Sequence, residues 1–88
     1  MRTPIYSTRF KKEYKQAQKR GLDLGIIDKI IVDLVNEVPL PPHNKDHPLV
    51  GNYIGCRECH VQNDWLLIYK IEGNEITFLR TGSHSDLF

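Results

Sequence analysis

The sequence predicts an α+β fold, with two helices in its N-terminal part and an antiparallel β-sheet in its C-terminal part. Apolar residues recur with helical spacing up to residue 38, whereas β-branched and aromatic residues dominate after residue 53. Short polar turns separate the expected strands, as in an antiparallel meander. The 88 residues fit one small domain, which would span 1–88 in the order β-α-α-β-β-β.

A strand and a helix open the chain. We expect the strand at residues 3–6 and the helix at about residues 8–20, capped by Ser7 or Thr8. One narrow apolar stripe with helical spacing predicts this helix. Its members are Phe10, Tyr14 and Ala17. Gly21 then suits the position after the helix, where a left-handed backbone is common.

The second helix has the strongest periodicity in the chain. We expect it at about residues 24–38, with Asp23 as its N-cap. Its apolar positions are Ile27, Ile30, Ile31, Leu34, Val35 and Val38. The following segment, PLPPHNKDHPL, ends the helix because proline lacks a backbone N–H and clashes with the preceding turn. It should form an irregular loop, and such loops often carry function.

Three strands are expected in the C-terminal part, at residues 53–61, 65–71 and 75–81. Turns of polar residues and glycine at 62–64 and 72–74 join them. One face of this sheet must pack on the helices. The other face is partly free, so polar side chains can converge on it.

Basic residues are concentrated at the N-terminus, although the net charge is only +1. Residues 1–20 hold seven basic residues and one acidic residue, whereas residues 21–88 hold five basic and ten acidic residues. This asymmetry indicates a patch for an anionic partner such as RNA, and the alternative is a solvated helix face without a partner. The basic residues of the expected first helix include Lys11, Lys12, Lys15, Lys19 and Arg20.

No segment of the sequence predicts a membrane protein. A transmembrane helix needs about 18 consecutive apolar residues, and no such run occurs. The N-terminal segment is charged and lacks the apolar core of a secretory signal. We therefore expect a cytoplasmic protein without a membrane partner.

Histidine, acidic and arginine side chains that can share protons or bind phosphate are concentrated in the C-terminal half. They are His47, Glu58, His60, Asp64, Arg80 and His84. Strand alternation puts Glu58 and His60 on one face, where the carboxylate can orient the imidazole for proton transfer near neutral pH. Asp64 lies across the turn from this pair. Arg80 and His84 can reach the same surface, where an arginine can bind phosphate oxygens.

The segment 56–60 spells C-x-x-C-H, which is also typical of haem attachment, while C-x-x-C occurs in zinc and redox sites. Alternation along a strand puts Cys56 and Cys59 on opposite faces, so their sulfur atoms cannot easily share a metal ion. No second C-x-x-C completes a zinc site. We expect two unpaired thiols, with metal, redox or haem binding as the alternative.

Two aromatic side chains, Trp65 and Phe88, allow two interpretations. Trp65 opens an expected strand, and Phe88 is the last residue of the sequence. Each can pack in the core or contact a substrate, since an exposed aromatic ring is a platform on which a nucleic-acid base stacks. The sequence leaves both interpretations open.

Four segments then carry a resemblance to known proteins. They are KDHPL (Lys45–Leu49), RECHV (Arg57–Val61), DWLLIYK (Asp64–Lys70) and LRTGSHSDLF (Leu79–Phe88). These segments resemble the YafQ-type toxins of the RelE/ParE superfamily, which belong to type II toxin–antitoxin systems. The resemblance implies a twisted antiparallel sheet packed on two N-terminal helices. It also implies ribosome-dependent cleavage of mRNA without a metal ion or other cofactor, and an antitoxin that wraps and suppresses the toxin.

The resemblance assigns roles to individual positions. The implied catalytic residues are His47, His60, Asp64 and His84. The implied supporting or substrate-contacting residues are Glu58, Trp65, Arg80 and Phe88. Contacts to the ribosome or RNA are expected from Lys11, Lys12, Lys15, Lys19, Arg20 and Lys45.

The chemistry expected of these groups is attack of the RNA 2′-hydroxyl on the adjacent phosphorus. The products are a 2′,3′-cyclic phosphate and a 5′-hydroxyl. The base is His60, aided by Glu58 or Asp64, with His47 as the alternative base. His84 is the expected acid, and Arg80 would stabilise the charge that gathers on the phosphate.

Three other interpretations stay open. A ParE-like toxin that inhibits DNA gyrase without enzymatic activity would share the fold, but the histidine-rich C-terminal half favours a nuclease. A small metal- or haem-binding module built on Cys56, Cys59 and His60 is the second. A degenerate toxin that only binds its antitoxin is the third.

Overall fold

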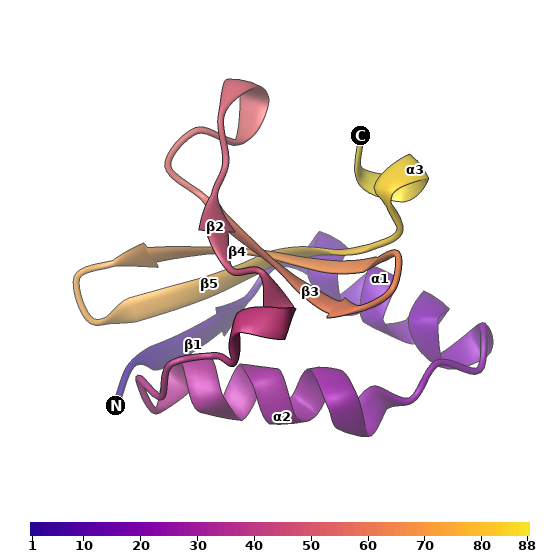
Figure 1. Ribbon diagram of the computed structural model, residues 1–88, viewed down its shortest axis with the longest axis horizontal. Helices are drawn as coiled ribbons and strands as arrows, with labels where there is room; N and C mark the ends of the chain where they lie inside the picture. Colours follow the sequence, from indigo (N-terminus) through magenta and orange to yellow (C-terminus); the bar gives the residue numbers. More distant parts are fainter.

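The computed structural model describes all residues, 1–88, and shows a five-stranded sheet with two helices on one face and a short third helix beyond the other (Figure 1). The strands are β1 (Thr3–Tyr6), β2 (His47–Pro48), β3 (Arg57–Gln62), β4 (Trp65–Glu72) and β5 (Glu75–Gly82). The helices are α1 (Thr8–Lys19), α2 (Leu24–Val35) and α3 (His84–Leu87), with 3₁₀ turns η1 (Pro42–Asn44) and η2 (Gly51–Tyr53). The strand order is β1-β5-β4-β3-β2. The α+β prediction is confirmed.

Local sequence determines where the two long helices begin. The Ser7 hydroxyl accepts a hydrogen bond from the Phe10 backbone N–H at 3.0 Å, and the Asp23 carboxylate accepts one from Gly25 at 3.0 Å. Gly21 follows α1 with a left-handed φ of 78°. The predicted first helix is therefore confirmed. None of the helices has the length and apolar character needed to cross a bilayer.

The second helix is shorter than predicted. α2 ends at Val35, and Glu37 has a left-handed φ of 62°. The residue before a proline avoids the helical region, so the chain leaves the helix ahead of Pro39. Val38 was expected on the buried stripe, but it lies outside the helix and is 47% exposed.

The sheet is mixed, whereas the sequence predicted an antiparallel one. Strands β3, β4 and β5 form the expected antiparallel meander, but β1 runs parallel to β5. Short turns impose antiparallel pairing on consecutive strands. No short turn links β1 to β5, because both long helices and three strands lie between them in the chain. The N-terminal strand can therefore join the edge of β5 in a parallel direction.

The meander begins at Arg57 rather than at residue 53. Gly51 and Gly55 have left-handed φ values of 70° and 88°, which glycine adopts without steric cost. The chain therefore turns through η2, and extended structure starts only at β3. The helical and alternating patterns in the sequence do not predict the two short elements β2 and α3.

Two apolar clusters lie on opposite faces of the sheet. The larger cluster joins α1 and α2 to the sheet and includes Phe10, Ile27, Ile30, Leu67, Tyr69 and Phe78. The smaller cluster consists of Cys56, Leu66, Ile68 and Leu87. Side chains of β4 alternate between the two clusters, so this central strand is covered on both faces. The smaller cluster lies under the face on which the candidate site is built.

Candidate active site

One row of residues crosses four strands of the sheet and contains three candidate side chains. His47 of β2 lies opposite Glu58 of β3, and Glu58 lies opposite Ile68 of β4. Ile68 in turn lies opposite Arg80 of β5. Residues directly opposite on neighbouring strands share a face of the sheet. His47, Glu58 and Arg80 therefore share the face of the smaller apolar cluster.

A β-bulge brings Arg80 into this row. The register of β4 and β5 shifts after Ile68, so that Tyr69 lies opposite Phe78. Strict alternation would group Arg80 with Phe78 on the face that the helices cover. The extra residue, Leu79, turns Arg80 to the other face, as bulges do.

Glu58 lies at the centre of the candidate site. Its side chain is only 5% exposed, and Oε1 lies 3.5 Å from His47 Nε2 and 3.8 Å from His60 Nε2. Its other oxygen, Oε2, is buried without a hydrogen-bond partner. Buried carboxylate oxygens normally have a partner. Oε2 of Glu58 is an exception to this rule.

The backbone determines the tautomer of His47. Its Nδ1 lies 2.6 Å from the carbonyl oxygen of Lys45. Because a carbonyl oxygen only accepts hydrogen bonds, Nδ1 must carry the proton in the neutral ring. The lone pair is then on Nε2, which faces Glu58. His47 can accept a proton at this atom.

Asp64 contacts His84. From the sequence, Asp64 was one of two acids predicted to aid His60 as the base. Its Oδ1 accepts a hydrogen bond from the His84 backbone N–H at 2.9 Å and lies 2.8 Å from His84 Nδ1. These hydrogen bonds lower the pKa of Asp64. Asp64 occupies the turn between β3 and β4 with a left-handed φ of 53°, which aspartate tolerates better than most residues.

The three imidazole rings form a continuous series. The ring centroids of His47 and His60 are 6.2 Å apart, and those of His60 and His84 are 5.9 Å apart. The Phe88 ring follows, 6.5 Å from His84, with Tyr53 edge-on to it at 5.6 Å. Phe88 is 63% exposed, so it presents a surface rather than filling the core.

Trp65 is a core residue. It is 3% exposed, and its indole N–H donates a hydrogen bond to the Thr81 hydroxyl at 2.9 Å. The Thr81 hydroxyl donates in turn to the Leu66 carbonyl oxygen at 2.7 Å. A direct substrate contact by Trp65 does not fit this burial. The side chain can support the site only by packing beneath the turn that carries Asp64.

Arg80 forms a nearly buried ion pair with Glu13 of α1. The Nη2–Oε2 distance is 2.6 Å and the Nε–Oε1 distance is 3.2 Å, and the two side chains are 12% and 11% exposed. The hydrogen bonds from Arg80 to Glu13 raise the pKa of the guanidinium. The sequence does not predict this pair, although Glu13 is the single acid among the N-terminal basic residues.

The basic residues of α1 and of its C-cap differ in their surroundings. All five basic residues within α1 are exposed and form no ion pair in the chain: Arg9, Lys11, Lys12, Lys15 and Lys19. Arg20 instead pairs with Asp86, at 2.7 Å between Nη1 and Oδ2, and this contact lowers the pKa of Asp86. Lys45 is exposed on the loop before β2. The four lysines are therefore free to meet an external anion, while Arg20 is already engaged.

Three further residues hold the loop of His47 and were not singled out in the sequence. The buried Asn44 side chain donates a hydrogen bond to the His60 carbonyl oxygen at 2.8 Å. Asp46 accepts one from the Tyr69 hydroxyl at 2.6 Å. Asn44, Asp46 and Tyr69 all lie in or beside the KDHPL and DWLLIYK segments, which is the one signal in the sequence that could have found them. Their hydrogen-bond partners depend on the fold.

The two cysteines lie on opposite faces of the sheet, as alternation predicts. Cys56 packs in the smaller apolar cluster and Cys59 in the larger one. Both are free thiols. Burial raises the pKa of Cys59 to about 12, which disfavours the thiolate that binds metals and reacts with disulfides.

Other side chains have the spacing of a metal site. Ligand atoms of His47, Glu58 and His60 all lie within 4.8 Å of one another. Two imidazole nitrogens and a carboxylate oxygen form a ligand set that suits zinc or copper. An ion bound there would occupy the nitrogen atoms that proton transfer needs. Metal binding and acid–base chemistry at these residues would therefore compete.

A helical hairpin on a mixed sheet, with imidazoles and carboxylates gathered on the other face, is the architecture of a small bacterial toxin. The family model described as the bacterial toxin of type II toxin–antitoxin systems, YafQ, matches residues 2–88. The chain belongs to the YafQ toxin family.

Individual relatives agree with this assignment. The chain is 44% identical over 84 residues to the mRNA interferase toxin YafQ of Escherichia coli K12, covering 94% of this chain and 91% of that protein. The crystal structure of YafQ from E. coli BL21(DE3) superposes with a TM-score of 0.95 at 42% identity, covering 100% and 99% of the two chains. The comparisons give no support to the gyrase-inhibitor alternative.

Two further solved structures concern partners and metals. YafQ in the E. coli DinJ–YafQ complex has a TM-score of 0.93 and 43% identity, covering 100% of this chain and 99% of that chain. A metal-bound toxin from Helicobacter pylori has a TM-score of 0.92 and 43% identity, covering 100% of both chains.

Proposed function

We propose that this protein is the toxin of a cytoplasmic type II toxin–antitoxin system and cuts mRNA on the ribosome. The observation that carries this proposal is the buried Glu58 between His47 and His60, with the His84–Asp64 pair beside it. These groups form two units that can move protons on one face of the sheet. The name of the E. coli relative, an mRNA interferase, supports the same activity.

The reaction needs one group that removes a proton and one that supplies a proton. The 2′-oxygen loses its proton to His47 or His60 as it bonds to phosphorus, and the Glu58 carboxylate lies within 4 Å of both rings. The bond from phosphorus to the 5′-oxygen breaks, and His84 protonates that oxygen. The products are a 2′,3′-cyclic phosphate and a 5′-hydroxyl, and no metal ion takes part.

Two further side chains are suited to hold the substrate. Arg80 lies in the row of Glu58 and can stabilise negative charge on the phosphate. Phe88 is exposed beside His84 and offers its ring to a base. Together they would orient one nucleotide against the three imidazoles.

Primer extension on an mRNA that is being translated tests the proposal. The expected result is cuts in register with codons that appear only when both ribosomes and the protein are present. A DNA strand of the same sequence should stay intact, because DNA lacks the 2′-hydroxyl. Cutting of that DNA would contradict the mechanism, and intact mRNA would contradict the activity.

The unpaired lysines of α1, with Lys45, are proposed to contact ribosomal RNA. Affinity for ribosomes should then fall steeply as salt rises, because each phosphate contact releases a counterion. The double variant Lys12→Gln/Lys19→Gln should bind ribosomes more weakly and with a shallower salt dependence. Lys29→Gln on α2 removes an exposed charge elsewhere and serves as the control. Equal salt dependence in both variants would exclude this surface.

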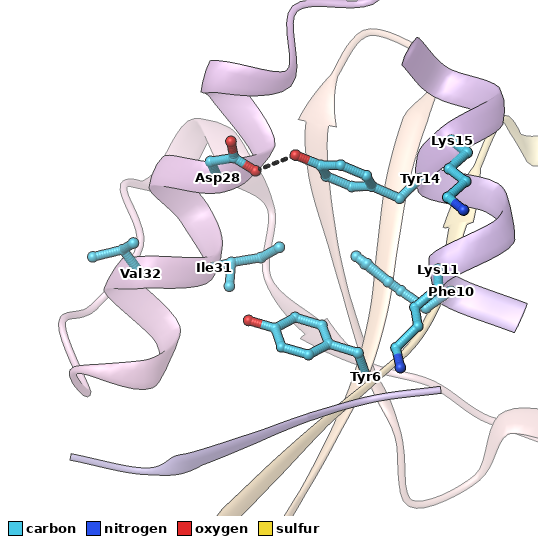
Figure 2. Close-up of a pocket in the computed structure, with 8 residues that line it drawn as sticks. All are labelled: Tyr6, Phe10, Lys11, Tyr14, Lys15, Asp28, Ile31 and Val32. Carbon is cyan, nitrogen blue, oxygen red and sulfur yellow. Dashed lines mark hydrogen bonds between the residues drawn. The ribbon is translucent and has the colours of Figure 1, made fainter. Parts of the chain in front are cut away.

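A groove on the other side of the molecule is the proposed seat of an antitoxin segment (Figure 2). It encloses about 510 Å³ between β1, α1 and α2, and none of its lining residues belongs to the imidazole series. Its apolar lining consists of Tyr6, Phe10, Tyr14, Ile31 and Val32, with Lys11 and Lys15 along α1. The one acidic lining residue, Asp28, is engaged by the Tyr14 hydroxyl at 2.7 Å. A segment with apolar and acidic side chains complements this surface.

Antitoxin affinity of two variants tests this surface. Val32 is 53% exposed in the groove, so Val32→Asp should fold and should weaken binding of the cognate antitoxin at least tenfold. Val50, 83% exposed, lies outside the groove, and Val50→Asp is the matched control. Equal affinity of Val32→Asp and wild type would show that the antitoxin binds elsewhere.

A further inference from the structure

We infer that Glu13 is a positioning residue for cleavage. It holds the guanidinium of Arg80 and, through Arg80, the C-terminal segment that carries His84. Glu13 is the one acidic residue among the first twenty, in a segment otherwise suited to anions. An acid that weakens a basic patch would be a disadvantage unless it had a separate task.

The contact between the two side chains has the geometry of a fork. Arg80 Nη2 lies 2.6 Å from Glu13 Oε2, and Arg80 Nε lies 3.2 Å from Glu13 Oε1. With exposures of 12% and 11%, both side chains are largely shielded from water. Two parallel charge-assisted hydrogen bonds fix the plane of a guanidinium as well as its position. A surface pair with a single contact would fix neither.

The donors of Arg80 are almost fully used. A guanidinium has five N–H donors. Two meet Glu13, one on Nη1 meets the Tyr53 hydroxyl at 3.0 Å, and one on Nη2 meets the Asp86 carbonyl oxygen at 3.3 Å. One N–H on Nη1 has no partner. Glu13 therefore decides which single edge of Arg80 is offered to a phosphate.

The same helix is joined to the C-terminal segment at further points. Glu13 Oε1 accepts a hydrogen bond from the Thr81 backbone N–H at 3.3 Å. Arg20, the C-cap of α1 two turns beyond Glu13, pairs with Asp86 at 2.7 Å. Asp86 also completes the capping box with Ser83 that starts α3 at His84. Loss of Glu13 should thus disturb Arg80 first and the placement of His84 with it.

The expected effect is on the chemical step. This inference rests on the proposed function, since Arg80 and His84 act in it. Small displacements of groups at a reacting centre can lower rates by about 10²-fold. Glu13→Gln should therefore lower the single-turnover rate on programmed ribosomes about 10- to 100-fold. The ribosome concentration for half-maximal rate should stay within about twofold, because the exposed lysines of α1 that are proposed to meet the ribosome are unchanged.

A double-mutant cycle separates this role from general destabilisation. The variants are Glu13→Gln, Arg80→Lys and both together, and Arg80→Lys keeps the charge while it removes the fork. If Glu13 acts through Arg80, adding Glu13→Gln to the Arg80→Lys variant should lower the single-turnover rate by less than about threefold. Asp33→Asn removes an equal charge from the Lys29 pair on α2 and should leave the rate unchanged.

Free-protein measurements complete the test. In NMR spectra without RNA, Glu13→Gln should shift the Arg80 Nε–H and His84 amide signals, and Asp33→Asn should not. If Glu13→Gln unfolds at the assay temperature, Glu13→Asp replaces it in the test, because aspartate retains the carboxylate. Its single-turnover rate should then lie between those of wild type and the loss expected for Glu13→Gln. A wild-type rate in either folded Glu13 variant would overturn the inference. So would a double variant whose loss of rate equals the product of the losses in Glu13→Gln and Arg80→Lys. Intact mRNA with wild type would instead overturn the proposed function.

Discussion

A single oxygen of Asp64 holds His84 twice, through the backbone N–H at 2.9 Å and through ring Nδ1 at 2.8 Å. A carboxylate oxygen only accepts, so Nδ1 carries a proton and Nε2 is the atom that can exchange a proton with substrate. The imidazole is thereby oriented from the turn between β3 and β4, the strand pair to which Glu58 also belongs.

His84→Ala should lower cleavage of ribosome-bound mRNA by about 10²–10⁴-fold, the usual contribution of one proton transfer. The measurement is the single-turnover rate, with thermal unfolding recorded for each variant. His43→Ala is the matched control, because His43 is exposed on η1 and outside the imidazole series. A His84→Ala rate equal to that of wild type would remove His84 from the acid role.

Protonation of Asp64 should release His84 only in acid. The two hydrogen bonds from His84 lower the pKa of Asp64. Because the pKa of Asp64 is lower in the folded state, the stabilisation from its contact with His84 is present above the unfolded-state pKa of about 3.9. This stabilisation is lost as the pH falls through the folded-state pKa. The His84 amide signal should therefore show an acidic titration step with a midpoint below about pH 3.9. Asp64→Asn should abolish the titration, and a midpoint above 4 would contradict the assignment.

Thr81→Val should destabilise the fold without removing a candidate catalytic group. The substitution leaves the Trp65 indole N–H buried without a partner, which costs about 2 kcal/mol. For a domain of this size the melting temperature should fall by roughly 10 °C. Thr77→Val, on the same strand but half-buried, is the control. An unchanged melting temperature would mean that this hydrogen bond does not hold Trp65.

Cys59 should resist alkylation in the folded protein. Burial raises its pKa to about 12, so the folded state favours the neutral thiol. The corresponding stabilisation is complete below the unfolded pKa of about 8.5 and is lost as pH rises through the folded value. At pH 8, iodoacetamide should modify Cys59 on the order of 10³-fold more slowly than in urea, as followed by mass spectrometry. Cys56→Ser isolates the reaction of Cys59, and rapid labelling there would contradict its burial.

Stripping metal from the protein should leave cleavage unchanged. The protein is treated with EDTA, dialysed and then added to a translation mixture that supplies the magnesium needed by ribosomes. The proposed proton transfers use only side chains of the chain, so treated and untreated samples should cut equally. Loss of cutting that zinc or copper restores would assign a catalytic ion to His47, Glu58 and His60, whose ligand atoms have suitable spacing.

Sequence patterns located most elements and several faces correctly because they depend on local periodicity. The first helix follows from its cap and its apolar stripe, and the meander follows from its turns. Alternation along the strand expected at residues 53–61 placed Cys56 and Cys59 on opposite faces, as observed. The errors in the bounds of predicted elements are at α2 and β3, where a proline or a glycine overrode the apolar pattern.

By itself, the sequence determined the elements, the shared face of Glu58 and His60, and the concentration of imidazoles in the C-terminal half. Only the tertiary structure decided how these groups pair. The bulge that turns Arg80 toward the row of Glu58, its fork with Glu13, and the bond of Asp64 to His84 join residues distant in the chain. Strand register and helix packing set such contacts, and neither quantity is encoded in the spacing of residues along one segment.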